Sequence, residues 1–429
     1  MVTLDKVYHA AFVLKNIARK TDMIEAPKLS DDFTMYLKTE NLQLTGSFKL
    51  RGAYYKISQL TQEQRDAGIV ACSAGNHAQG VALAATRMGA KSIVCMPEGA
   101  PISKVEATKA LGAQVVLVKG AYDDAYAYAC KLRDETGMTF IHPFDDDEVI
   151  AGQGTIGLEI LNQLEDVDVV LCPVGGGGLI SGVAYAIKSL NPKVKVYGVQ
   201  AENAASMQKS IELGEQVTLP TVKTFADGIA VKHPGDTTFR MIQKYVDGIV
   251  TVSEDEIAAA ILALMEKQKV VAEGAGAVSV AAAMFHRVPD IAGKVGPCPT
   301  SSSDCSQSPN EASDGACLRQ RPKKKVCCLI SGGNIDVNIL SRVITRGLLT
   351  SGRNAMLTIA LEDKPGQLVG VASIISECGA NVVGVTHERS DANMPVASCF
   401  LKVSMETRDF EQINEIKTKL TAAGFRIVN

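Results

Sequence analysis

The sequence lacks an excess of one charge, a long apolar run and an arrangement of cysteines typical of disulfides. Its 44 basic and 47 acidic residues leave a net charge of −3, which offers little electrostatic attraction to nucleic acid or to an anionic membrane. No apolar run approaches the roughly 20 residues of a membrane-spanning helix, and the N-terminal stretch does not resemble a signal peptide. Most of the eleven cysteines stand singly in apolar segments, as Cys72, Cys95 and Cys172 do, which is typical of buried free thiols in a reducing compartment. We therefore expect a cytoplasmic protein with no nucleic-acid partner and no membrane segment.

The organisation of the chain is a repeated alternation of short strands and helices. At 429 residues it is long enough for two or three domains. The periodicity predicts strands at 68–72, 92–96, 114–118, 168–173 and 194–200, and helices at 4–20, 49–60, 77–88, 102–111, 122–135, 148–164, 180–190, 203–213, 236–245, 254–268 and 275–287. Strands this short, apolar on both faces and separated by helices, indicate an α/β fold with a mainly parallel sheet.

Residues 296–325 interrupt this alternation. They are nearly all small, polar or proline, and such a segment buries too little apolar surface to offset its ordering entropy, so we expect it to be disordered. Its three cysteines, Cys298, Cys305 and Cys317, have no C-x-x-C spacing and no nearby histidine, so we expect no zinc site there.

The part of the chain after the interruption predicts a second domain. A strand at 326–330 and a helix at 335–345 complete a first domain of residues 1–345, and a glycine-containing linker follows at 346–354. The rest predicts strands at 356–361, 381–387, 395–403 and 425–428, and helices at 367–378 and 410–422. This βαββαβ order is that of a ferredoxin-like module, here residues 355–429.

Lys49 stands out because its neighbours, Phe48 and Leu50, are apolar. An apolar setting disfavours the ammonium form and lowers the pKa, which gives an amine that can condense with an aldehyde. The alternative is a lysine that extends along the start of a helix with its charge in water. The stretch alone leaves both interpretations open.

Three glycine-containing turns each follow a predicted strand. They read S-A-G-N-H-A-Q-G from Ser73, V-G-G-G-G-L from Val174 and S-G-G-N from Ser331. In open parallel sheets, ligands bind at the carboxyl ends of strands, and four consecutive glycines before a helix let backbone N–H groups approach a phosphate. A dinucleotide fingerprint G-x-G-x-x-G is absent from the run. A phosphate site, an amine and neutral polar groups together indicate pyridoxal 5'-phosphate as cofactor.

These motifs, together with S-F-K-L-R-G around Lys49, occur in the order found in a known family. On them the chain resembles the fold-type II pyridoxal-phosphate enzymes, and among these the threonine dehydratases (threonine ammonia-lyases). The resemblance covers the whole chain except residues 296–325. It implies a fold like that of the tryptophan synthase β subunit, with two open, twisted, mainly parallel sheets and a small subdomain at roughly 50–145.

The resemblance also implies a role for each residue of the motifs. Lys49 would hold the cofactor aldehyde and act as the catalytic base, and Ser331 would face the pyridine nitrogen. The other cofactor-binding residues would be Phe48, Asn76, Gly175, Gly176, Gly177, Gly178 and Leu179, and the substrate carboxylate would meet Ser73, Asn76 and His77. For His77, a capping or core residue is an equally weighted alternative. Glu273 lies near the ring in relatives, and its alternative is a carboxylate favoured by a helix N-terminus.

The reaction that the resemblance implies is α,β-elimination of L-threonine to 2-oxobutanoate and ammonia, with L-serine giving pyruvate. Serine racemases of the same fold carry a second serine after the position of Ser73, and Ala74 stands there, which favours a dehydratase. A serine dehydratase or racemase remains the alternative of the same fold. Outside this class, the chain could be a regulator without activity or a nucleotide-binding oxidoreductase. Met207 stands where relatives with a divalent metal would have a second carboxylate, so we expect no metal ion at that site.

The C-terminal module resembles an ACT domain through L-E-D-K-P-G-Q-L and E-C-G-A-N-V-V-G-V. In that family the turn after the first strand binds an amino-acid effector, usually across a domain dimer. The residues matching this site are Asp363, Gly366, Gln367, Leu368 and Asn381. A module that serves only dimerisation is the alternative. We expect a homodimer or homotetramer with an amino-acid substrate and an amino-acid effector.

Overall fold

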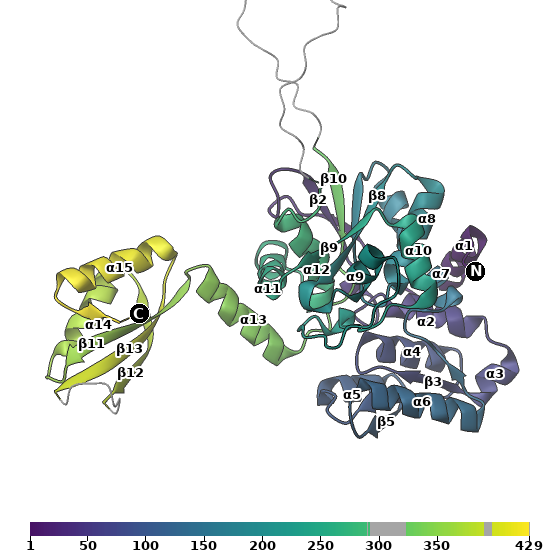
Figure 1. Cartoon of the computed structure of the whole chain (residues 1–429), viewed down its shortest axis with the longest axis horizontal. Coiled ribbons are helices and arrows are strands. Elements are labelled where there is room, and N and C mark those ends of the chain that lie inside the picture. Colours follow the sequence, from purple (N-terminus) through teal and green to yellow (C-terminus); the bar gives the residue numbers. More distant parts are fainter. Residues whose placement is uncertain (290, 292–322, 390–396, 429) are drawn as a thin grey trace, which may run out of the picture. The chain divides into compact units, whose positions relative to one another are not determined.

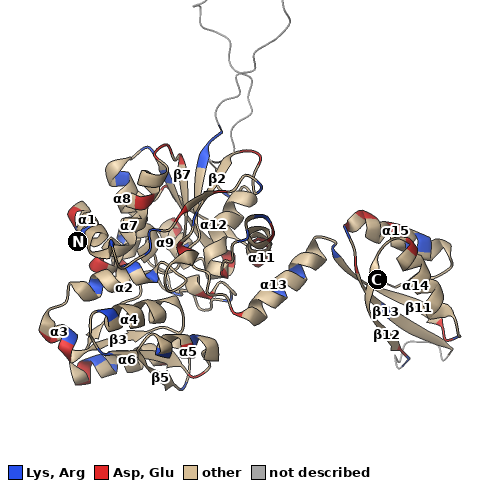
Figure 2. Ribbon diagram, turned by 180° about the vertical axis from the view of Figure 1, so that it is seen from behind, with Lys and Arg blue, Asp and Glu red and all other residues tan. Residues whose placement is uncertain are grey.

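The computed structural model describes residues 1–289, 291, 323–389 and 397–428. The chain forms two compact units, Met1–Asp336 and Val337–Asn429, which are drawn in Figure 1. In the described part, no helix is long and apolar enough to cross a membrane. Acidic and basic residues alternate along the surface helices, as the red and blue segments of α3 in Figure 2 show, which agrees with the small net charge.

The first unit contains two sheets. The larger has the strand order β1 (Met23–Glu25), β2 (Thr34–Lys38), β10 (Lys325–Leu329), β7 (Val169–Pro173), β8 (Lys195–Ala201) and β9 (Gly248–Val252), and only the β1–β2 pair is antiparallel. The smaller is parallel, in the order β5 (Gln114–Val118), β4 (Ser92–Pro97), β3 (Ile69–Cys72) and β6 (Thr139–Phe140). The expected α/β fold with two mainly parallel sheets is confirmed.

Helices surround both sheets of the first unit. They are α1 (Leu4–Leu14), α2 (Lys49–Ser58), α3 (Gln62–Ala67), α4 (Asn76–Arg87), α5 (Ile102–Ala110), α6 (Tyr122–Thr136), α7 (Asp147–Gln163), α8 (Gly178–Leu190), α9 (Ser206–Leu213), α10 (Asp236–Tyr245), α11 (Glu254–Ala263) and α12 (Gly274–Met284). Short helical turns lie at Glu40–Leu42, Glu202–Ala204, Asp227–Ile229 and Leu264–Gln268.

One buried core of the first unit lies between the larger sheet and its helices, and others cover the smaller sheet. Every residue of β7 is buried, as expected for a parallel strand covered on both faces. Its Val170 and Cys172 share a core with Ile156 of α7 and Ile180 of α8. Each fully buried aliphatic side chain contributes about 1.5–3 kcal/mol. The sheet is therefore a rigid support for the loops at its edge.

The strand order places three of the sequence motifs side by side. β2, β10 and β7 are adjacent and parallel, so their carboxyl ends lie at one edge of the sheet. The segment to Lys49 follows β2, Ser331 follows β10 and the glycine run follows β7. This edge is where ligands bind in open α/β sheets.

The second unit is an antiparallel sheet packed against two helices. It contains α13 (Val337–Thr350), β11 (Asn354–Glu362), α14 (Gln367–Glu377), β12 (Asn381–Glu388), β13 (Ser398–Glu406), α15 (Phe410–Ala422) and β14 (Arg426–Ile427). The strand order is β12-β13-β11-β14. α14 and α15 bury Val371 and Ile416 against Ile359 and Leu401 of the sheet. The expected βαββαβ order is present.

Several expected element boundaries were wrong. The first helix ends at Leu14 rather than at residue 20. The expected linker 346–354 is largely helical, because α13 continues to Thr350 and β11 begins at Asn354, so only residues 351–353 lie between them. Lys325, placed in the expected disordered segment, begins β10. Residues 296–322 of that segment, with Cys298, Cys305 and Cys317, lie outside the described residues.

Candidate functional site

The segment before Lys49 is held against the turn that follows β10. The Phe48 N–H donates to the carbonyl oxygen of Ser331 at 3.1 Å, and the Gly333 N–H donates to that of Gly46 at 2.9 Å. Between them, Ser47 and Gly332 form an isolated antiparallel bridge. These backbone contacts fix Lys49, the first residue of α2, beside Ser331.

The Lys49 amine lies in a mostly apolar setting with one carbonyl partner. Its Nζ donates to the carbonyl oxygen of Pro143 at 2.7 Å and lies 5.3 Å from the centre of the Phe48 ring. Burial lowers the pKa of Lys49 to about 8, although the nearby Glu273 carboxylate opposes the shift. A much larger share of this amine is neutral near pH 7 than for an ordinary lysine.

A chain of hydrogen bonds between amide and carboxyl groups runs beside the amine. Asn76 Nδ2 donates to Glu273 Oε1 at 2.6 Å, and Asn334 Nδ2 donates to Asn76 Oδ1 at 2.8 Å and to the carbonyl oxygen of Thr45 at 2.8 Å. Burial and the nearby Asp227 raise the pKa of Glu273 to about 7, while the Asn76 amide favours its ionised form. The sequence assigned no role to Asn334, although it ends the S-G-G-N motif, and this position was its signal.

The glycine run forms the turn from β7 into α8 and leaves no room for side chains. Gly177 has a φ of +96°, which L-residues with a side chain rarely adopt. A Cβ on Gly176 would lie 2.5 Å from the Phe144 ring, and one on Gly178 would lie 2.7 Å from the Phe144 carbonyl oxygen. The N-terminus of α8 follows directly, and its backbone N–H groups and dipole favour an anion.

Residues 142–145 connect the glycine run with Lys49. Pro143 accepts the Lys49 hydrogen bond, and the next residue, Phe144, lies against Gly176 and Gly178. The backbone N–H groups of Phe144 and Asp145 donate to His142 Nδ1 at 3.3 and 2.8 Å. The sequence interpretation missed this segment, because it follows β6, a strand of only two residues that produces no periodic pattern.

The remaining predicted residues lie around the same point, but their side chains differ in orientation. Ser73 Oγ accepts from the Gly75 N–H at 3.1 Å in the turn before α4. Ser331 Oγ donates to the carbonyl oxygen of Ala275 at 3.3 Å. His77 is 3% exposed, and its Nε2–H donates to the carbonyl oxygen of Ile141 at 2.9 Å. Burial and the nearby Lys49 lower the pKa of His77 to about 3, so this imidazole is neutral.

These groups fit a phosphorylated aldehyde. The glycine run and the α8 N-terminus form a cradle whose space a Cβ would fill, and a lysine amine with a lowered pKa lies across residues 143–144 from it. The Asn76 amide and the Ser331 hydroxyl are neutral polar groups at the same place. Leu179 is buried in the first turn of α8 and supports the cradle.

Comparison with known proteins agrees with this chemistry. Residues 14–295 match the model of a family described as pyridoxal-phosphate dependent enzyme, and the chain belongs to this family. It is 47% identical over 429 residues to an L-threonine ammonia-lyase of Thermotoga maritima, covering all of this chain and 99% of that protein. It is 42% identical to an L-threonine ammonia-lyase of Geobacter sulfurreducens, with 96% of each covered.

Solved structures of the same fold are similar to most of this chain. The processed form of threonine deaminase isoform 2 from Solanum lycopersicum aligns with a TM-score of 0.69 and 37% identity, over 80% of this chain and 89% of that one. Maize serine racemase aligns with a TM-score of 0.70 and 29% identity, over 81% and 98%. The cofactor of this chain is therefore pyridoxal 5'-phosphate.

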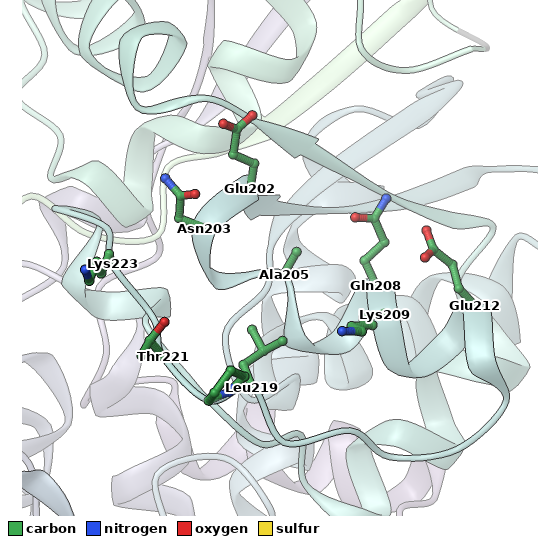
Figure 3. Close-up of a pocket in the computed structure, with 10 residues that line it drawn as sticks. Glu202, Asn203, Ala205, Gln208, Lys209, Glu212, Leu219, Thr221 and Lys223 are labelled. Atoms are coloured by element: carbon green, nitrogen blue, oxygen red, sulfur yellow. The ribbon is translucent and has the colours of Figure 1, made fainter.

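The region of the expected missing metal site lies around Met207, in the first turn of α9. Met207 is fully buried beneath Gly177. A hollow nearby is lined by residues that include the carboxylates Glu202 and Glu212 and the lysine Lys209 (Figure 3). The absence of a metal ion at this place stays a prediction from the sequence.

The residues matched to an effector site belong to the second unit and do not all lie together. Asp363 follows β11, and Gly366, Gln367 and Leu368 lead into α14. Asn381 pairs with Glu406 at the opposite end of the sheet. The nine residues of β13 separate the two ends, a span of roughly 25 Å at the usual rise per residue.

Proposed function

We propose that this protein catalyses the α,β-elimination of L-threonine to 2-oxobutanoate and ammonia, and that it also converts L-serine to pyruvate. The observation that carries the proposal is the Lys49 amine, whose pKa of about 8 suits both attachment of an aldehyde and removal of a proton. The identity to L-threonine ammonia-lyases over the whole chain supports the choice of substrate.

Lys49 has two tasks in this proposal. Pyridoxal phosphate, when bound, supplies an electron-withdrawing ring that stabilises negative charge at the substrate Cα. Lys49 first holds the cofactor aldehyde and, after the substrate amine displaces it, takes the Cα proton on its neutral Nζ. The β-hydroxyl leaves with a proton as water, and the Lys49 amine then takes the place of the product nitrogen. The released enamine tautomerises to an imine, which one water molecule hydrolyses to the 2-oxo acid and ammonia.

Ser331, Asn76 and Glu273 set the polar environment of the ring. Ser331 offers a hydroxyl rather than a carboxylate, so it does not enforce a charged pyridine nitrogen. Asn76 is held in place by Glu273 on one side and Asn334 on the other, which fixes the direction of its amide. On the resemblance of the S-A-G-N-H-A-Q-G turn to this family, we assign the 3-hydroxyl of the cofactor to Asn76.

The substrate carboxylate is assigned to the turn from Ser73 to His77. The first turn of α4 directs backbone N–H groups towards this turn, and a helix N-terminus favours a carboxylate. His77 contributes its backbone N–H and not its ring, because the neutral ring is buried and occupied by Ile141. Ser73 contributes its hydroxyl.

The experiment that tests the function compares wild type with Lys49→Ala. The wild-type protein with pyridoxal phosphate is expected to absorb visible light and to form 2-oxobutanoate from L-threonine. Lys49→Ala is expected to lose the visible band and at least about 1000-fold of the activity, since it removes both tether and base. A colourless wild-type protein, or an active Lys49→Ala protein, would contradict the proposal.

A serine racemase is the second candidate, and the likeness to maize serine racemase favours testing it. Racemisation needs a proton donor on the face opposite Lys49, and Ala74 cannot transfer a proton. We therefore expect L-serine to give pyruvate without D-serine. Chiral chromatography of serine after incubation separates the two functions, and accumulation of D-serine would favour racemase.

Regulation, assembly and location form the last part of the proposal. We assign the second unit to the ACT domains on its βαββαβ order, with an amino-acid effector at Asp363, Gly366, Gln367, Leu368 and Asn381. Because Asn381 lies at the far end of the sheet from Asp363 in one copy, such an effector site needs two copies, and we propose a homodimer or homotetramer. The cysteines of the described part are free thiols, which supports a cytoplasmic location.

A further inference from the structure

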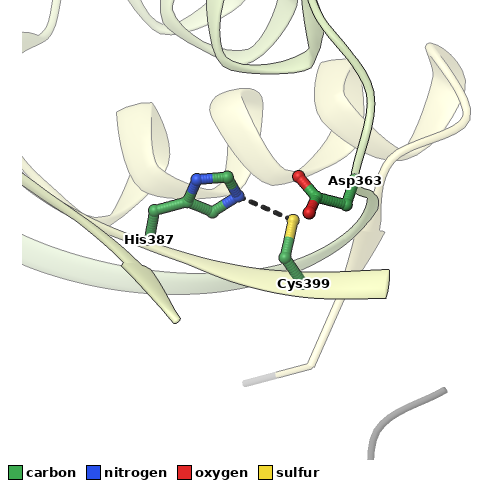
Figure 4. A group of neighbouring side chains, drawn as sticks. All are labelled: Asp363, His387 and Cys399. Atoms are coloured by element: carbon green, nitrogen blue, oxygen red, sulfur yellow. Dashed lines mark hydrogen bonds between the residues drawn. The ribbon is translucent and has the colours of Figure 1, made fainter. Parts of the chain in front are cut away.

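Three side chains with metal-binding atoms meet in the second unit, far in sequence from Lys49. They are Asp363, directly after β11, His387 of β12 and Cys399 of β13 (Figure 4). The strand register explains why they meet. Cys399 pairs with Leu361, and His387 pairs with Leu401. Since alternate residues of a strand share a face, Cys399 and His387 lie diagonally on one face of the sheet.

The distances between the three groups suit one ion. His387 Nε2 lies 2.8 Å from Cys399 Sγ, and one ligand atom from each residue lies within 4.8 Å of the other two. Bonds of about 2.3 Å to sulfur and about 2.0–2.1 Å to nitrogen or oxygen place tetrahedral ligand atoms roughly 3.3–3.6 Å apart. Small changes of side-chain torsion bring the three atoms to that spacing.

We propose that Asp363, His387 and Cys399 bind one Zn²⁺ ion, with water as the fourth ligand. A thiolate, an imidazole and a carboxylate form a donor set that zinc accepts, whereas Mg²⁺ and Ca²⁺ prefer oxygen ligands alone. Cys399 is 1% exposed while Asp363 and His387 are exposed, so the ion has an open approach from solvent and a buried sulfur beneath it.

Binding is accompanied by the release of one proton. Burial and the nearby Asp363 raise the pKa of the Cys399 thiol, whereas the nearby Arg389 lowers it. The thiol is therefore protonated in the free protein, and its proton passes to solvent when the S–Zn bond forms. No electron is transferred, so no oxidant or reductant is required.

Two of the lysines near the cluster are paired with carboxylates, and Arg389 is the positive charge that lies against a proposed ligand. Lys364 is paired with Glu362 at 2.6 Å, and Lys402 with Glu388 at 2.6 Å. Arg389 donates to Asp363 Oδ1 at 3.0 Å, which leaves the second carboxylate oxygen to ligate the ion. A hydrogen-bonded carboxylate is the usual arrangement of a metal ligand, because its partner fixes its orientation.

Zinc bound there would join three neighbouring strand ends. The site ties the turn after β11 to β12 and β13, and it therefore stabilises the second unit against unfolding by mass action. The proposal is independent of the elimination activity, since none of the three residues belongs to the first unit.

The test uses the full-length protein with reduced thiols, freed of metal by a chelator. Zn²⁺ is titrated in competition with a chromophoric chelator for wild type, His387→Ala, Cys399→Ser and the control Cys130→Ser, which removes a half-buried cysteine of α6 in the first unit. Because the chain has eleven cysteines, the test is the difference in bound Zn²⁺ between wild type and each variant, not the total amount of Zn²⁺ bound. Wild type and Cys130→Ser are expected to bind one tight Zn²⁺ per chain that His387→Ala and Cys399→Ser do not. These two variants are expected to bind that ion at least about 100-fold more weakly.

A second readout identifies the sulfur ligand. Co²⁺ added in place of Zn²⁺ is expected to produce a thiolate-to-metal absorption in the difference spectrum, absent in Cys399→Ser and present in Cys130→Ser. Asp363→Asn and His387→Ala change exposed residues, so they stay folded even where a buried substitution at Cys399 does not, and circular dichroism checks this. Equal Zn²⁺ affinity in wild type, His387→Ala and Asp363→Asn would overturn the proposal.

Discussion

At the scale of single residues, the functional properties follow from what surrounds Lys49. The carbonyl oxygen of Pro143 holds the amine, and burial removes much of the hydration that would favour its charge. Glu273 restores part of that preference through its negative charge. The balance of these two effects decides at which pH the amine reacts.

The pH dependence of cofactor capture tests this balance. Only the neutral amine attacks an aldehyde, so the rate at which cofactor-free protein binds pyridoxal phosphate is expected to rise with pH and to level off above about pH 8. An ordinary lysine would still gain rate up to about pH 10.5. The rate is measured from the visible absorption after mixing between about pH 6.5 and 9.5. A rate that keeps rising tenfold per pH unit beyond about pH 9 would disagree with the environment of Lys49.

Glu273→Gln supplies the matched comparison. Gln keeps the shape and an oxygen that can accept from Asn76 Nδ2, but it removes the negative charge that raises the pKa of Lys49. The levelling-off of cofactor capture is therefore expected at lower pH than in wild type. If the pH dependence of cofactor capture were the same in Glu273→Gln and wild type, the Glu273 carboxylate would be too well screened to affect the pKa of Lys49.

The sequence predicted the chemistry of the site but not all of the residues that form it. The glycine run, Asn76 and Ser331 belong to motifs that follow apolar strands, and such motifs can be found from their residue types, whereas Lys49 stood out through its apolar neighbours. Pro143, Phe144 and Asn334 act through a backbone oxygen, a ring contact and a second hydrogen bond. Partners of this kind depend on tertiary placement, so a single sequence carries no local signal for Pro143 and Phe144, and for Asn334 only its place at the end of the S-G-G-N motif.

At the scale of elements, the turn from β7 into α8 is the most constrained. Its four glycines lie between Phe144 on one side and Ile229, Thr238 and Met207 on the other. Thr238 Oγ1 donates to the Gly176 carbonyl oxygen at 2.6 Å, which fixes the direction of the next backbone N–H. A side chain at this turn would move the backbone away from the phosphate.

Gly176→Ala is therefore expected to weaken pyridoxal phosphate binding at least about tenfold. The new Cβ would lie 2.5 Å from the Phe144 ring, so the turn or residues 142–145 must shift. Titration of cofactor-free protein, followed by visible absorption, measures the dissociation constant. Gly99→Ala is the control, because a Cβ there meets no atom within 4 Å, and equal affinities of the two variants would contradict the argument.

A buried ion-pair network holds α2, the helix that begins with Lys49. Arg51 is 1% exposed and donates to both oxygens of Glu40 at 2.8 Å, and also to Glu159 of α7 at 2.6 and 3.0 Å. Lys38, at the end of β2, donates to the same Glu159 at 2.6 Å. The sequence interpretation missed four strands that are short or lie at sheet edges, namely β1, β2, β6 and β9. Because it missed β2, it also missed this ion-pair network.

Arg51→Ala is expected to destabilise the first unit by about 3–5 kcal/mol, because it leaves the Glu40 carboxylate buried without its cation. Urea unfolding measures this, and Lys109→Ala, which breaks an exposed pair with Glu106, is expected to cost less than about 1 kcal/mol.

Burial raises the pKa of Glu40, but Arg51 outweighs it and the pKa lies below 4.5. The wild-type pair therefore stabilises fully above that pH, and the difference between wild type and Arg51→Ala is expected to shrink as the pH falls below it. If the difference in free energy of unfolding between wild type and Arg51→Ala did not change with pH, this would contradict an unpaired, buried Glu40 carboxylate in the variant.

At the scale of the whole molecule, the chain combines a two-sheet unit with a four-stranded antiparallel unit. The alternation of strands and helices was enough to predict both, because hydrophobic periodicity reflects which faces are buried. The expected linker at 346–354 was wrong, since α13, whose glycine at position 347 is buried, continues to Thr350. Glycine inside a helix lowers local helix propensity, and only packing reveals that the helix continues.

The last prediction concerns deletions in the segment between α12 and β10, and the structure defines how far such a deletion can extend towards β10. β10 lies between β2 and β7 and delivers Ser331, and the Thr34 N–H donates to the Lys324 carbonyl oxygen at 2.9 Å. A deletion that removes Lys324 is therefore expected to disturb the sheet and the cofactor site. Deletion of residues 297–320 spares β10 and its contacts, and the cost of closing a loop changes by only about 0.6 kcal/mol for each doubling of its length. This shorter deletion is expected to keep the visible absorption and the rate of 2-oxobutanoate formation within about twofold of wild type. Loss of cofactor from the shorter deletion would instead assign residues 297–320 a part in shaping the site, whereas loss only when the deletion extends through Lys324 would locate the requirement in β10.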